Sequence, residues 1–166
     1  MATRWGCGAG NCLLERRPER LVVLGYRHWL AGYDTGSIDP WEMAWTLFAG
    51  ELGAADGRAT LATVADWVRE LRARSDGSPR FYPHSCRWLC RDECLALAAV
   101  SALQHGDPAS ATVSLAALGH GGTGCGAGAA AGSVADQLFH VGQVLMPVPP
   151  AVIEDIVSRP PRDSYH

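Results

Sequence analysis

Lysine is absent from the 166-residue sequence, and all 14 basic residues are arginine. Without a lysine amine the chain cannot form a Schiff base, hold pyridoxal phosphate through lysine or contain a P-loop. Acidic residues outnumber basic ones and give a net charge of -3. This balance argues against a protein that neutralises the phosphates of a nucleic acid, and so we expect no nucleic-acid partner.

Long apolar runs are also missing. The longest, around residues 95–100, falls far short of the roughly 20 residues that a helix needs to cross a membrane. The first twenty residues contain no apolar stretch of the kind found in secretory signals. These absences predict a cytoplasmic protein with no membrane contact, in which the six cysteines are reduced thiols or metal ligands rather than disulfides.

Hydrophobic residues make up 48% of the chain, which excludes a disordered protein, and the length suits one domain over residues 1–166. No stretch alternates strictly between apolar and polar residues as a half-buried strand does. We therefore predict an all-α fold, a compact single-domain helical bundle of about five main helices plus a short C-terminal helix. The composition further predicts a flexible Cys/Gly-rich arm over residues 1–16, a Gly/Ala-rich loop over 119–132, and an extended tail over 147–166 with a short docking helix.

Prolines and glycines set the expected helix boundaries. Pro18 is placed to open the first helix, which should end by Gly36. Asp39, Pro40 and Glu42 have the spacing of a capping box followed by a second helix. The remaining helices are expected near residues 57–74, 85–104, 107–118, 134–145 and 151–157.

The helix expected over residues 85–104 contains the most reactive side chains. With Ser85 as its cap, one stripe about 60° wide would carry two thiols and a carboxylate, those of Cys86, Cys90 and Glu93. Cys94 would lie beside this stripe. A thiol in the first turn of a helix and next to arginines should have a lowered pKa, so we expect Cys86 to be a reactive thiolate.

Such a stripe is suited to a thiolate-ligated metal ion. Cys86 and Cys94 would be about 12 Å apart along a helix, too far to share one ion with metal–sulfur bonds of about 2.3 Å. A single ion therefore needs further donors from the loop before the helix or from the N-terminal arm. The candidate ligands are Cys86, Cys90, Glu93, Cys94, His84, Cys7 and Cys12. Soft ligands of this kind favour zinc, Cu(I) or an iron–sulfur cluster.

Three other interpretations stay open. The cysteines can be small apolar core residues, with Glu93 paired to an arginine such as Arg27. Cys86 can be the nucleophile or ligand of a thiol- or metal-dependent enzyme. The chain can also be a purely structural subunit of a complex, because it has several tryptophans suited to a core or an interface, namely Trp41, Trp45, Trp67 and Trp88.

Binding is favoured over turnover. The hypothesis that combines these patterns is a small accessory or regulatory protein that binds a protein partner or forms a homodimer. The string from Gly119 to Gly124 matches G-x-G-x-x-G, but no strand precedes it, so we expect no nucleotide. His28 lies on the apolar face of the first helix, where it is either a satisfied core residue or reaches the cysteine helix.

Overall fold

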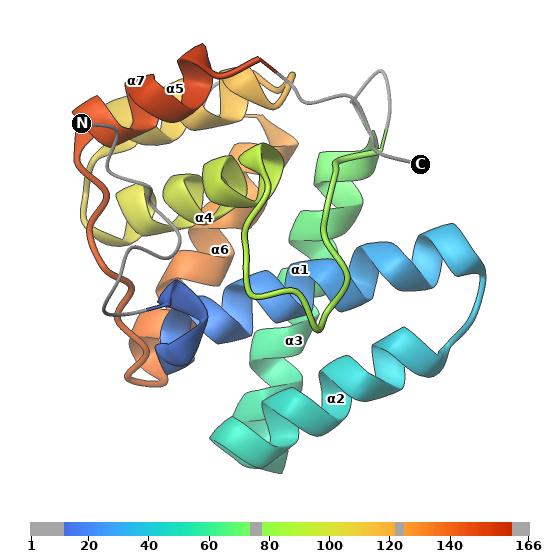
Figure 1. Ribbon diagram of the computed structural model, residues 1–166. Coiled ribbons are helices and arrows are strands. Elements are labelled where there is room, and N and C mark those ends of the chain that lie inside the picture. The colour runs from blue at the N-terminus through green and yellow to red at the C-terminus, as the bar shows by residue number, and fades with distance from the viewer. Residues whose placement is uncertain (1–11, 74–77, 122–124, 161–166) are drawn as a thin grey trace.

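The computed structural model describes residues 12–73, 78–121 and 125–160, and within these ranges every regular element is a helix (Figure 1). The all-α prediction is therefore confirmed. The prediction of about five main helices plus a short C-terminal helix undercounts the α-helices of these ranges, although each segment expected to be helical does overlap one. A 3-10 helix and seven α-helices follow one another as η1 (Leu13–Glu15), α1 (Arg17–Thr35), α2 (Asp39–Leu52), α3 (Ala54–Ala73), α4 (Arg91–Gln104), α5 (Pro108–Ala117), α6 (Gly126–His140) and α7 (Pro150–Ser158).

The turn between α1 and α2 has its glycine and its proline where the sequence predicted them, but α2 is not capped in the predicted way. Gly36 ends α1 with a left-handed φ of 67°, and Pro40 lies in the first turn of α2. The capping box expected at this helix is absent. The N-cap is Ile38, which has no polar side chain, and the Asp39 amide donates to the Ser37 hydroxyl at 3.2 Å. Asp39 is thus already inside the helix and cannot cap it.

Close packing of α1 on α2 depends on Gly32. A Cβ at this position would lie 2.2 Å from Trp41 Nε1, so only glycine leaves room for the indole. Trp41 stacks on Trp29 with ring centroids 5.2 Å apart, and its Nε1 donates to the Trp29 carbonyl oxygen at 3.1 Å. Tyr33 meets the same indole edge-on. One of the expected tryptophan anchors therefore joins the first two helices.

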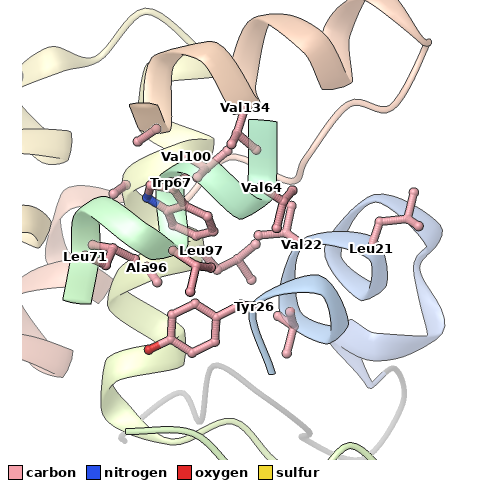
Figure 2. Close-up of a cluster of buried hydrophobic side chains, with 14 of the residues drawn as sticks. Leu21, Val22, Tyr26, Val64, Trp67, Leu71, Ala96, Leu97, Val100 and Val134 are labelled. Carbon is pink, nitrogen blue, oxygen red and sulfur yellow. The ribbon is translucent and has the colours of Figure 1, made fainter. Parts of the chain in front are cut away.

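The main core lies where α1, α3, α4 and α6 meet (Figure 2). Trp67 of α3 is fully buried there and contacts Tyr26 of α1, with ring centroids 6.0 Å apart. Helix α4 is the most enclosed element, because every residue from Glu93 to Ala102 is buried. A charged side chain on such a helix requires a partner within the protein, since burying an unpaired charge is prohibitively unfavourable.

The C-terminal helices cover the remaining faces of α4. Helix α5 begins as predicted, with Asp107 Oδ1 accepting a hydrogen bond from the Ser110 amide at 3.1 Å. Helix α7 follows an extended connection, as predicted, and buries Ile153 and Ile156 against α4. No helix in the described ranges is long and apolar enough to cross a membrane.

The expected loop over residues 119–132 is wrong from Gly126 onward, because α6 begins there. Cys125 caps this helix by accepting a hydrogen bond from the Gly128 amide at 3.4 Å. Gly126 allows a close approach to α3, since a Cβ there would lie 2.3 Å from Glu70 Oε2. The helix also ends at His140, so Leu145 is not part of it. Alanine has the highest helix propensity, and it dominates the first turns that composition alone had assigned to a loop.

Candidate functional site

The cysteine-containing stretch is mostly not helical. Helix α4 begins at Arg91, and residues 78–90 form an irregular segment that crosses α1 (Figure 1). In the expected helix the Cys90 amide would donate to the Cys86 carbonyl. Instead the Cys90 amide donates to Glu93 Oε2 at 2.8 Å, and the Cys86 carbonyl accepts from Arg27 at 2.7 Å. The predictions of a Ser85 cap and of one stripe carrying Cys86, Cys90 and Glu93 are therefore wrong.

A buried ion pair between Arg27 of α1 and Glu93 of α4 holds the base of this segment. The guanidinium is 1% exposed and the carboxylate is fully buried, with two nitrogen–oxygen distances of 2.5 and 3.1 Å. This is the pairing that the core-packing interpretation proposed for Glu93. A two-point contact between a planar guanidinium and a carboxylate also fixes their relative orientation.

The Glu93 carboxylate accepts four hydrogen bonds. Arg27 donates to both of its oxygens, the Tyr82 amide donates to Oε1 at 3.1 Å, and the Cys90 amide donates to Oε2. These bonds use the roughly four lone-pair positions of an ionised carboxylate. Cys90 and Glu93 also form the capping box of α4, because the Cys90 side chain accepts from the Glu93 amide. The acceptor positions of Glu93 are thus occupied by the Arg27 guanidinium and by two backbone amides.

Arg27 holds two further points of segment 78–90. Its Nη1 donates to the Cys86 carbonyl, and its Nη2 donates to the Trp88 carbonyl at 2.5 Å. At the other end of the segment the Arg80 amide donates to Asp92 at 2.9 Å, and its carbonyl accepts from the Tyr26 hydroxyl at 3.1 Å. An irregular segment is therefore tied to α1 and α4 at several backbone positions.

The imidazoles of His28 and His84 stack at the edge of the same contact. Their ring centroids are 5.4 Å apart and their planes are inclined by 30°. His28 of α1 is buried, and burial followed by the nearby His84 and Arg27 lowers its pKa from 6.5 to about 4. His84 lies on the exposed side of the pair. Of the two alternatives for His28, the buried position fits the core residue, and its contact with the cysteine-containing stretch is made through the His84 ring and not through a thiol.

Two of the candidate thiols are held in their neutral form. Burial, and then the Glu93 charge, raise the pKa of the Cys94 thiol to about 12. The same two causes raise the pKa of the Cys90 thiol well above its ordinary value. Cys94 packs with Leu95 and Ile156, whereas the Cys90 sulfur donates to the Arg80 carbonyl at 3.4 Å. These two sulfurs occupy different surroundings and behave as packing and capping groups.

The other candidate ligands are only partly brought together. The Cys12 sulfur donates to the Arg87 carbonyl at 3.4 Å, so Cys12 lies beside the residue that follows Cys86. Cys7 lies outside the described residues. Within the described ranges no group of three or more His, Cys, Asp or Glu side chains is placed to hold a metal ion. Cys86 is half-buried in segment 78–90 and precedes the start of α4 at Arg91, so it is not in the first helical turn that was expected to activate it.

The hydrogen bonds between Arg27 and the backbone of segment 78–90 are harder to predict from sequence than its pairing with Glu93. Arg27 stands in the middle of an apolar helix and is itself the signal of a buried partner. The carbonyls of Cys86 and Trp88 carry no such signal, because every residue has a carbonyl group. Trp88, one of the expected anchors, is 50% exposed at the surface of segment 78–90.

The fold and this junction define an all-α protein in which a buried arginine–glutamate pair fixes an irregular segment on its surface. No family, no curated protein and no solved structure matches this chain.

Proposed function

We propose that this chain is a small accessory or regulatory protein that binds a partner protein through segment 78–90, with Trp88 as the anchor. The observation that carries the proposal is a half-exposed tryptophan whose own carbonyl oxygen is held by the buried Arg27 guanidinium. Tryptophan is strongly enriched among the residues that dominate binding energy at protein interfaces. Binding residues also tend to lie on loops that a rigid scaffold positions.

The attachment of the segment supports binding in a second way. Ordering a loop on association costs free energy, and a segment that is already fixed avoids most of that cost. The ionisable groups at the junction support binding over turnover, because Glu93 is saturated with hydrogen bonds and the Cys90 and Cys94 thiols are neutral. The simplest partner is a second copy of the chain, since homodimers are the commonest soluble oligomers.

A photocrosslinking amino acid at position 88 tests the proposal in the native host. The control carries the same group at Phe139, which is 66% exposed and lies beside Gln104. Gln104 ends α4, whereas segment 78–90 leads into its start, and the helix between them is roughly 20 Å long. We expect a discrete protein adduct at position 88 that is absent at position 139. An adduct of doubled mass identifies self-association. The lack of any discrete adduct at position 88 would refute the proposal.

A thiolate metal site is the second candidate, favoured by the contact between the Cys12 sulfur and the backbone next to Cys86. Two thiolates are fewer than the four ligands of a structural zinc site. Further donors, for zinc, Cu(I) or an iron–sulfur cluster, would have to come from residues such as Cys7. Elemental analysis of protein purified anaerobically tests this candidate, with Cys86→Ser as the comparison. Less than stoichiometric metal in the unsubstituted protein removes it.

A further inference from the structure

The stacked pair of His28 and His84 joins α1 to segment 78–90 beside the buried Arg27–Glu93 pair. His28 is only 6% exposed, and the ring that stacks on it belongs to the segment. Moving the segment away from α1 would therefore expose His28 to water and separate the two imidazoles. The protonation state of His28 and the docking of the segment are coupled through this one contact.

The surroundings of His28 oppose a positive charge. Arg27 precedes it on α1 and is cationic, while His84 faces it from the segment. Two acidic groups of α4 belong to this junction, and both already accept hydrogen bonds. The Glu93 oxygens accept from Arg27, Tyr82 and Cys90, and Asp92 accepts from the Arg80 amide. Burial is the largest of these causes, because a buried imidazole loses the hydration of its charged form.

We propose that uptake of a proton by His28 weakens the docking of segment 78–90 on α1, so that mild acid raises the fraction of molecules in which the segment is released. The proton comes from solvent and is held on the imidazole of His28 in the released state. A role of this opening in controlling a partner rests on the proposed function, whereas the opening itself does not.

The sign and size of the effect follow from linkage. The pKa of His28 is about 4 when the segment is docked and returns toward 6.5 when the ring is exposed. Docking is therefore fully stabilised above pH 6.5, and this stabilisation is lost as the pH falls toward 4. Between about pH 7 and about pH 5 the ratio of released to docked molecules should rise about twenty-fold. This window ends above the range in which exposed carboxylates usually titrate.

Hydrogen exchange of the Tyr82 amide measures release directly, because this amide donates to Glu93 only while the segment is docked. Its protection, corrected for the intrinsic exchange rate, should fall about twenty-fold between about pH 7 and about pH 5. His28→Gln, which cannot take up the proton, should abolish this dependence. His140→Gln, at an exposed histidine of α6, should retain it.

An NMR titration of the His28 ring in the unsubstituted chain provides a second measurement that does not depend on folding of the variant. We expect its pKa well below 6.5. A pKa near 6.5, unchanged Tyr82 protection, or the same pH dependence in His28→Gln would overturn the inference. Both measurements use the chain alone, so a negative result in them does not bear on partner binding through Trp88. A negative crosslinking result at Trp88 likewise does not bear on the coupling between His28 and the segment.

Discussion

Replacing Glu93 by glutamine is the most informative perturbation of the α1–α4 junction. The carboxylate accepts from Arg27 at both oxygens and from the amides of Tyr82 and Cys90. Glutamine has one carbonyl oxygen, and its amide group would place its own hydrogens against two of these four donors. The substitution also leaves the Arg27 guanidinium, which is 1% exposed, without its counter-charge.

Breaking a buried pair by changing one partner costs about 3–5 kcal/mol. Whole domains are stable by only about 5–15 kcal/mol, so this is a large fraction of the total. With a urea dependence of about 2 kcal/mol per molar, the unfolding midpoint of Glu93→Gln should fall by about 2 M. The matched control is Asp66→Asn, which breaks a surface pair with Arg69 whose side chains are 60% and 62% exposed. This control should change stability by less than about 0.5 kcal/mol.

A double substitution separates the ion pair from its backbone contacts. In other proteins an apolar replacement of both partners often restores stability. Here Arg27→Met with Glu93→Leu would also remove the partners of the Cys86 and Trp88 carbonyls and of the Tyr82 amide. We therefore expect the double variant to stay at least about 2 kcal/mol below the unsubstituted protein.

Urea unfolding followed by circular dichroism and tryptophan fluorescence provides the measurement for all three variants. A midpoint shift below about 0.5 M for Glu93→Gln would refute the assignment of this pair as the main support of the segment. Full recovery in the double variant would show that the backbone hydrogen bonds contribute little.

Three further predictions concern other groups. Burial and the Glu93 charge raise the pKa of Cys94 from 9.0 to about 12, so this thiol should resist iodoacetamide in the native protein and react after unfolding. The stability that the neutral thiol contributes is complete below pH 9 and is lost as the pH rises toward 12. The Cys94→Ala substitution should remove this pH dependence. Cys90→Ser should retain the stability of α4 because serine caps well, whereas Cys90→Ala should cost about 1 kcal/mol in urea unfolding; equal losses for both would contradict the capping role. Gly32→Ala should cost about 1–3 kcal/mol by displacing Trp41, whereas Gly50→Ala, where a Cβ meets nothing within 4 Å, should gain about 0.5 kcal/mol; thermal denaturation of the pair checks the contrast.

Local signals predicted the fold class and most helix boundaries. Pro18, Gly36 and Asp107 act within a few residues of themselves, through fixed φ, a left-handed turn and a cap. The pairing of Glu93 with Arg27 was foreseen as one alternative, because a carboxylate on an apolar helix face requires a counter-charge. The predicted start of α4 is wrong by several residues. The Cys86 carbonyl, which the first turn of the expected helix would use as an acceptor, instead accepts a hydrogen bond from Arg27.

The amino-acid order alone determined that this chain folds into helices, because apolar spacing and the residues that start and stop helices are local properties. Which cysteines are neutral, which imidazoles meet and where the fourth helix begins were decided only by tertiary structure. The physical reason is that charge burial and backbone hydrogen bonding at this junction depend on groups far apart in the chain, such as Arg27 and Glu93, separated by 66 positions.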